Sequence, residues 1–314
     1  PNGGTILPDT INTRMILNDL GSPYLVNSDL IVEEGGILIL NPGVQILMPE
    51  NASIYVYGQL QVMGKSDNPV KIEGNPADRK RWGALVFDHS EDGSEINHLE
   101  LSRASLGHKN PLDFKANLSI INSFVRVTGL KISDASTNPV FVKGARASIS
   151  HSVLHSTAIC DYINVAESSG ALIEFCDFLG DQAPDTDAID LDAVGLSFIR
   201  YNKFKNFQGL NSDGLDIGYS DEIIIEGNIF SNISDKGISV GMNSHVQATG
   251  NIFLNCNAGI AVKDEGSIID LDRNTFYSNK IGVSCFEKEP GRGGGSAHIL
   301  NSIFAGGEQQ AGMA

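Results

Sequence analysis

Five short segments decide how this chain folds: AIDLDAV (188–194), GLDIGYS (214–220), GISVGMN (237–243), GIAVKDE (259–265) and GVSCFEK (282–288). The apolar residues at their second positions are Ile189, Leu215, Ile238, Ile260 and Val283, at spacings of 26, 23, 22 and 23 residues. Ile163 and Val140 extend this row toward the N-terminus at spacings of 26 and 23. A recurrence of this length predicts a solenoid in which each repeat forms one turn.

Two further rows run in register with the first. One row is apolar and mostly aromatic: Phe124, Leu154, Phe178, Phe204, Phe230, Phe253, Phe276 and Phe304. Two residues before each of these stands a small or amide residue: Asn122, Ser152, Cys176, Asn202, Asn228, Asn251, Asn274 and Ser302. Short alternating segments such as 196–199 and 223–225 indicate strands rather than helices. We expect equivalent residues to stack at about 4.8 Å, with phenylalanines inside and amides bonded along the ladder.

These rows, the N-x-F signature and the G-I-x-V strand resemble the right-handed parallel β-helix superfamily, the pectin-lyase-like fold. The resemblance covers nearly the whole chain and implies an all-β, single-stranded right-handed parallel β-helix with three parallel sheets. We predict about 11–13 turns of 22–26 residues in one elongated domain, residues 1–314. Residues 1–80 would form the N-terminal cap and first turns, and residues 120–305 the regular turns with the N-x-F ladder.

Composition and charge limit the classes of protein. Apolar residues are 41% of the 314, which excludes intrinsic disorder, and no apolar run approaches the roughly 18–20 residues of a membrane span. The net charge of -16 opposes nucleic-acid binding. The chain begins at Pro1 and ends at Ala314 without a capping segment, so we expect a processed piece of a longer polypeptide with further domains.

Acidic residues gather where the repeat is enlarged. The connection from the Phe row to the Ile row takes 11 residues in the turns of Phe178 and Phe204, and 7 or 8 in later turns. In the two larger turns an aspartate precedes the row residue by two positions, and another follows it, facing away from the core. The cluster expected on one face of one sheet comprises Asp161, Asp187, Asp190, Asp213, Asp216 and Asp235, with Lys236.

Stacked like charges destabilise a sheet, so something must offset them. Raised pKa values, a bound cation, or the nearby Lys236, Arg200 and Lys203 would each do so. A cluster of this kind favours a functional site, although a solvated acidic face remains the alternative.

One enzymatic interpretation is glycoside hydrolysis. The segment NSDGLD (211–216) is similar to the NTDGID motif of the polygalacturonase family, and SDKGISV (234–240) falls where that family has GDDCIAI. The resemblance implies Asp213 and Asp235 as catalytic acid and base. Lys236 replaces the second acid of the pair, and Asn257 to Gly259 replace the histidine-glycine of that family. Asp187, equivalent to Asp213 one turn earlier, is a further catalytic candidate.

A second interpretation is a polysaccharide lyase, since several lyase families share this fold. Ca²⁺ held by Asp187, Asp190, Asp213 and Asp216 could neutralise a uronate, because calcium prefers oxygen ligands. Lys236 could act as the base or as a plain counter-ion. Arg200 and Lys203, with Asp190 and Asp216, could bind the substrate, and no organic cofactor is expected.

A third interpretation is non-catalytic: an adhesin-like or spacer module of a larger surface protein, with Ca²⁺ or nothing in the acidic ladder. A flat parallel sheet also suits carbohydrate binding without cleavage. We therefore predict a secreted or cell-surface protein that binds or cleaves polysaccharide, and leave open whether it is an enzyme.

Overall fold

The computed structural model describes residues 4–76 and 80–313. Contacts within the chain divide it into two units, Pro1–Ala158 and Ile159–Ala314. In each unit, short strands separated by turns build three parallel sheets, here called sheets A, B and C. The described residues form about 12 turns, and their helical content is one 3₁₀ turn, η1 (Asp19–Gly21). The predicted all-β solenoid with three parallel sheets is confirmed, while the prediction of a single domain stays a prediction.

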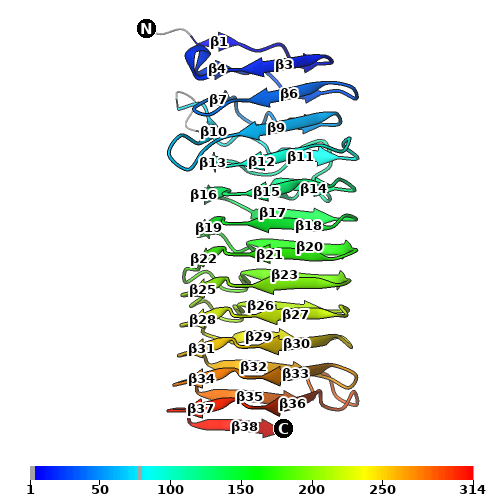
Figure 1. Ribbon diagram of the computed structural model, residues 1–314, viewed down its shortest axis with the longest axis vertical. Coiled ribbons are helices and arrows are strands. Elements are labelled where there is room, and N and C mark those ends of the chain that lie inside the picture. The colour runs from blue at the N-terminus through cyan, green and yellow to red at the C-terminus, as the bar shows by residue number, and fades with distance from the viewer. Residues whose placement is uncertain (1–3, 77–79, 314) are drawn as a thin grey trace. The chain divides into compact units, whose positions relative to one another are not determined.

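In the first unit, successive strands of each sheet pair in parallel (Figure 1). Sheet A contains β1 (Thr5–Ile6), β4 (Tyr24–Leu25), β7 (Gln45–Met48), β10 (Val70–Gly74), β13 (Leu99–Ser102), β16 (Lys131–Ala135) and β19 (Val153–Ser156). Sheet B contains β2 (Thr10–Ile11), β5 (Leu30–Val32), β8 (Ile54–Val56), β11 (Leu85–Asp88), β14 (Ala116–Ile121) and β17 (Asn138–Lys143). Sheet C contains β3 (Arg14–Leu17), β6 (Ile37–Leu40), β9 (Gln59–Met63), β12 (Glu95–Asn97), β15 (Arg126–Thr128) and β18 (Ala147–Ser150).

The second unit repeats this arrangement with more regular turns. Sheet A contains β22 (Asp177–Leu179), β25 (Lys203–Lys205), β28 (Ile229–Ser231), β31 (Ile252–Leu254), β34 (Thr275–Tyr277) and β37 (Ile303–Ala305). Sheet B contains β20 (Ile163–Ser168), β23 (Ile189–Val194), β26 (Leu215–Gly218), β29 (Lys236–Val240), β32 (Ala258–Lys263), β35 (Ile281–Phe286) and β38 (Gln309–Met313). Sheet C contains β21 (Ala171–Glu174), β24 (Ser197–Arg200), β27 (Ile223–Glu226), β30 (His245–Thr249), β33 (Ile268–Asp272) and β36 (Ser296–Leu300).

The Ile row that defined the repeat is the register of sheet B. Ile189 pairs with Leu215, Leu215 with Ile238, Ile238 with Ile260 and Ile260 with Val283. All five side chains are at most 2% exposed. Their regular burial explains the periodicity, because a residue that faces the core in one turn faces it in the next.

The Phe row forms a stack through the core of the second unit. Consecutive rings from Phe178 to Phe304 lie 4.5 to 4.9 Å apart at interplanar angles of 4 to 12°. This stack also accounts for the glycine of the G-I-x-V strand. A Cβ atom on Gly237 would lie 2.7 Å from the ring of Phe253, and Gly214 stands in the same relation to Phe230. Glycine therefore lets the backbone of sheet B approach the rings closely.

The amide row forms a closed hydrogen-bonded ladder. Asn228 Oδ1 accepts the backbone N–H of Asn202 at 2.9 Å, and Asn228 Nδ2 donates to the carbonyl of Ile199 at 2.7 Å. The same pattern repeats at Asn251 and Asn274. All of these amides are at most 1% exposed, and the ladder satisfies their donors and acceptors together.

The predicted Phe row fails at its N-terminal end. The side chain of Phe124 is 42% exposed, and Ile132 takes the inward place as the register partner of Leu154. Asn122, two residues before Phe124, is a turn residue with φ of 46° directly after β14. The N-x-F motif at Asn122 therefore lies in a loop and not in a strand. The spacing of 22 residues between Ile132 and Leu154, which is one repeat of the solenoid, identifies the inward-facing residue correctly.

Candidate functional site

The predicted acidic residues meet on the outward face of sheet B in the second unit. Asn164 pairs with Asp190 and Asp190 with Asp216, so these residues occupy one position of β20, β23 and β26. Asp187 and Asp213 stand just before β23 and β26. The parallel register thus brings together aspartates that are 26 residues apart in the sequence.

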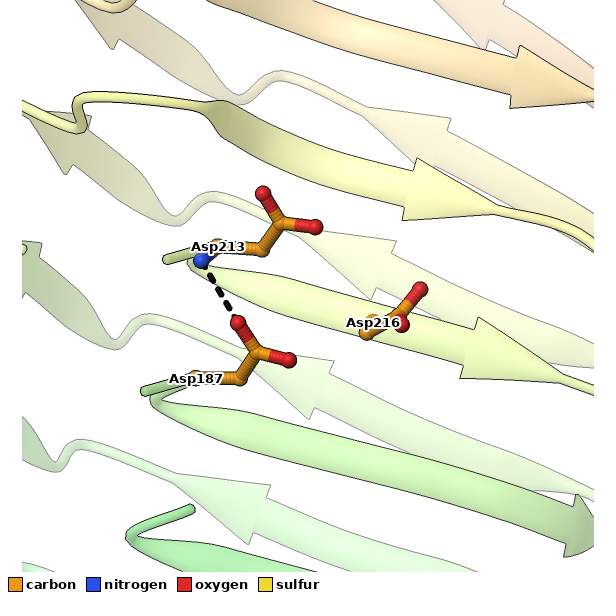
Figure 2. Close-up of side chains that lie close together, drawn as sticks. All are labelled: Asp187, Asp213 and Asp216. Carbon is orange, nitrogen blue, oxygen red and sulfur yellow. Dashed lines mark hydrogen bonds between the residues drawn. The ribbon is translucent and has the colours of Figure 1, made fainter. Parts of the chain in front are cut away.

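Three carboxylates form the centre of the site, as Figure 2 shows. Asp187, Asp213 and Asp216, here called the aspartate trio, each offer an oxygen, and these oxygens all lie within 4.8 Å of one another. Asp187 Oδ1 accepts the backbone N–H of Asp213 at 2.6 Å. Asp213 Oδ1 in turn accepts the backbone N–H of Lys236 at 2.8 Å. The carboxylates therefore form rungs of a ladder that continues into the next turn.

Burial and mutual repulsion shift the pKa values of two of these acids. Burial, followed by the charge of Asp213, raises the pKa of Asp187 to about 9. Burial also raises the pKa of Asp213, but the ammonium of Lys236 counteracts it, and the value is about 7. Because Asp187 and Asp213 interact, the raised pKa values belong to the pair, and the trio keeps a proton to a higher pH than an isolated aspartate would.

Lys236 occupies the next rung and supplies the positive charge. Its Nζ lies 3.3 Å from both carboxylate oxygens of Asp213 and contacts Asp235 more closely. Burial alone would lower the pKa of Lys236, but Asp213 and Asp235 outweigh it, and the pKa is raised. Lys236 is thus a cation held between two acids.

Lys263 is a second cation of the site that the sequence patterns did not single out. Its side chain is only 10% exposed, and its Nζ lies 3.3 Å from Asp216 Oδ1, two turns earlier in the solenoid. Val262 pairs with Val240, and Val240 with Ile217, so the residue after Val262 faces outward on the same sheet as Asp216. Extending the outward row that begins at Asp192 and continues through Gly218 and Gly241 would have identified this lysine.

A groove opens beside Asp216 on the same face. It has a volume of about 240 Å³, and its lining includes Asp192, Tyr219, Met242, Lys263 and Lys288. Tyr219 is 64% exposed, in contrast to the buried trio residue Asp213 at 4%. The site thus combines a buried charged centre with an open groove.

The remaining predicted residues lie elsewhere or are otherwise engaged. Arg200 is on sheet C, where its Nε lies 2.8 Å from Glu174, and Lys203 is on sheet A, 3.8 Å from Asp177. Asp190 is on the face of the trio and accepts a hydrogen bond from the side-chain amide of Asn164. The structure brings Asp187, Asp213, Asp216, Asp235 and Lys236 together and places Arg200 and Lys203 on other sheets.

The fold and the stacked site define a β-helix protein. The chain belongs to the family described as right handed beta helix region, which its residues 119–307 match. No curated protein matches the sequence. No helix among residues 4–76 and 80–313 is long and apolar enough to cross a membrane.

Two solved structures with similar folds carry names that refer to polysaccharides. A double mutant of the periplasmic alginate epimerase AlgG aligns with a TM-score of 0.57 at 14% identity, over 93% of this chain and 77% of that one. The catalytic domain of a GH87 α-1,3-glucanase variant, in complex with tetrasaccharides, aligns with a TM-score of 0.52 at 9% identity, over 91% of this chain and 66% of that one. At these identities the likeness shows the fold.

Proposed function

We propose that the second unit binds a polysaccharide along sheet B and hydrolyses its glycosidic bonds at the aspartate trio. The observation that carries this proposal is the convergence of the carboxyl groups of Asp187, Asp213 and Asp216, whose oxygens lie within 4.8 Å of one another, with the pKa raised more at Asp187 than at Asp213. Environments that push the pKa values of neighbouring acids apart are how enzymes assign acid and base roles. The names of the two solved structures support polysaccharide as the substrate class.

In this mechanism two acids carry out the chemistry, and Lys236 and Asp235 support them. Asp187 donates its proton to the leaving glycosidic oxygen while ionised Asp213, an oxygen of which lies within 4.8 Å of one of Asp187, attacks the anomeric carbon, because so short a separation leaves no room for a water between the two groups. Water then releases the sugar from its bond to Asp213 and gives a proton to the Asp187 carboxylate, which restores both groups. Lys236 keeps Asp213 ionisable, and Asp235 holds the lysine from its other side. Because the pKa of Lys236 is raised, the lysine is a poor general base, which favours hydrolysis over the elimination considered from the sequence.

Ca²⁺ is a weaker candidate for the same centre. The trio and the nearby Ser239 hydroxyl, which is buried without a hydrogen-bond partner among the described residues, would supply oxygen ligands. Calcium prefers six to eight oxygens, however, and Lys236 already neutralises Asp213. We propose Ca²⁺ only as a stabilising ion that competes with the proton of Asp187 and with Lys236, and no catalytic step depends on it.

A non-catalytic module is the second candidate function. Asp213 is only 4% exposed, and the carboxylates of Asp187 and Asp213 both accept backbone N–H groups. These bonds alone would make the trio a structural ladder. In either case we propose that the protein works where polysaccharide is found, outside the cell or in a periplasm.

The decisive experiment measures cleavage of a panel of neutral and uronic acid polysaccharides. We expect new reducing ends without the ultraviolet absorbance of an unsaturated product. Asp187→Asn should lower the rate about 10²–10⁴-fold, because an amide cannot donate the proton, although its oxygen can still accept the N–H of Asp213.

Asp221→Asn is the matched control, because Asp221 is 70% exposed and contacts His245 away from the trio. Its rate should equal that of the unmodified protein. Full activity of Asp187→Asn would exclude the trio as the catalytic centre, and silence on every polysaccharide would favour the structural module.

A further inference from the structure

The groove beside Asp216 owes its shape to two glycines. Leu191, Ile217, Val240 and Val262 are successive register partners on the buried side of sheet B. The residues that follow them face outward and are Asp192, Gly218, Gly241 and Lys263. Glycine therefore occupies this outward position in two successive turns, between Asp192 and Lys263. Because glycine has no side chain, a hollow is left on the sheet surface.

The side chain of Lys263 bounds one end of this hollow. A Cβ atom on Gly241 would lie 3.1 Å from Cε of Lys263, so the lysine side chain extends across this glycine toward Asp216. The residue is 8% exposed, and its ammonium ends 3.3 Å from Asp216 Oδ1. The groove thus lies directly beside the aspartate trio.

The lining of the groove combines an apolar surface with oxygen acceptors. Tyr219, 64% exposed, and Met242 line it together with the carboxylates of Asp190, Asp192 and Asp264. An exposed aromatic ring can pack against the C–H face of a pyranose, while carboxylates accept hydrogen bonds from hydroxyl groups. This combination suits a sugar better than an apolar ligand.

The charge of the groove selects among sugars. Its charged lining residues are four acids, Asp190, Asp192, Asp216 and Asp264, against two lysines, Lys263 and Lys288, and Lys263 is already paired with Asp216. The formal balance is negative, so the carboxylate of a uronic acid would be repelled, whereas hydroxyl groups would find acceptors. We propose that the groove is a subsite for an uncharged pyranose unit; this inference rests on the proposed function and specifies the substrate class of the same site.

The sharpest test fills the groove without disturbing the fold. A Cβ atom on Gly218 would meet nothing closer than Met242 Cγ at 3.6 Å and Asp192 Oδ1 at 3.8 Å, which are ordinary contacts. Gly218→Val places a branched residue, which strands favour, on the floor of the groove. We expect the melting temperature to stay the same or rise while Kd for neutral glucan or mannan hexasaccharides, measured by calorimetry, increases at least tenfold.

Tyr219→Ala should also weaken binding of the neutral hexasaccharides, by about tenfold. Tyr277→Ala is the matched control, because Tyr277 is 54% exposed on β34 of sheet A, and its affinity should be unchanged. Unaltered affinity in both Gly218→Val and Tyr219→Ala would overturn the subsite.

Binding and cleavage separate this inference from the proposed function. Cleavage of uronic acid polymers in preference to neutral ones would overturn the neutral subsite and leave hydrolysis at the trio intact. Neutral binding that Gly218→Val abolishes, without any cleavage, would support the subsite and refute the hydrolase. The absence of any binding or cleavage would overturn both.

Discussion

Two ladders in the second unit are built by the same register from side chains that differ by one group. The asparagine ladder runs through Asn202, Asn228, Asn251 and Asn274, and the aspartate ladder through Asp187 and Asp213 to Lys236. In both, a side-chain oxygen accepts the backbone N–H of an adjacent turn. An amide also donates hydrogen bonds, so each asparagine bonds both the next asparagine and a backbone carbonyl. The donors and acceptors of the ladder therefore satisfy one another.

Ionised carboxylates accept hydrogen bonds but donate none, so stacking them brings like charges together without any hydrogen bond between the carboxylates. In the aspartate ladder, the raised pKa of Asp187 and the ammonium of Lys236 at the next rung reduce this charge. The comparison teaches that one solenoid geometry stacks amides into a ladder whose donors and acceptors satisfy one another, and acids into a ladder whose charge must be offset.

Converting the amide ladder to an acidic one should have the largest effect. Asn228→Asp places a carboxylate against the carbonyl of Ile199 and Oδ1 of Asn251, two acceptors that cannot donate a hydrogen bond to it. We expect the free energy of unfolding to fall by about 3–5 kcal/mol at neutral pH, as for an uncompensated buried charge. Chemical denaturation followed by circular dichroism would measure this loss.

Asn232→Asp is the matched control for this substitution. Asn232 belongs to an exposed row in which its amide donates to Asn206 at 3.0 Å, and water can solvate the new charge. We expect a cost below about 1 kcal/mol. Equal losses for Asn228→Asp and Asn232→Asp would contradict the contrast between the two ladders.

The pH dependence of stability tests the aspartate ladder. The pKa of Asp187 is raised from 3.8 to about 9, so between these values the folded protein holds a proton that the unfolded chain has released. Stability therefore decreases as pH rises from about 4 to about 9, by at most about 1.4 kcal/mol per pH unit for this group. Asp213 acts in the same direction up to about pH 7.

Melting curves of the unmodified protein and of Asp187→Asn across this range would show the effect. The groups that face Asp187 are Asp161, Asp213 and Asp216, with Lys236 beside Asp213. The variant should lose less stability toward high pH, whereas Asp221→Asn should not change the slope. Identical slopes for all three proteins would mean that the pKa of Asp187 is the same in the folded and the unfolded protein.

The smallest effects are expected at the cations that lie outside the site. Arg200 pairs with Glu174 and Lys203 with Asp177, both at least partly in solvent. Arg200→Ala and Lys203→Ala should each change stability by less than about 1 kcal/mol and oligosaccharide affinity by less than twofold. A tenfold loss of affinity for uronic acid oligomers would instead support the binding role inferred from the sequence.

Much of the fold could be predicted from the sequence, because residues that recur once per turn are register partners in neighbouring strands. The spacing of Ile189, Leu215 and Ile238 gave the turns, and strand alternation placed Asp190 and Asp216 outward. The Phe row does not extend to Phe124, because the N-x-F motif there lies outside the strand and Ile132 is the inward partner of Leu154. Lys263 was missed because its partner Asp216 lies two turns away.

The sequence by itself determined the solenoid, its repeat length and the convergence of the aspartates, because a residue repeated once per turn must stack. Only the tertiary structure decided which acid has the most raised pKa, that Lys236 pairs with Asp213, and that Gly218 and Gly241 leave a groove. These properties depend on burial and on distances of a few ångströms between side chains of different turns. Such distances are set by packing, which no spacing along the chain encodes.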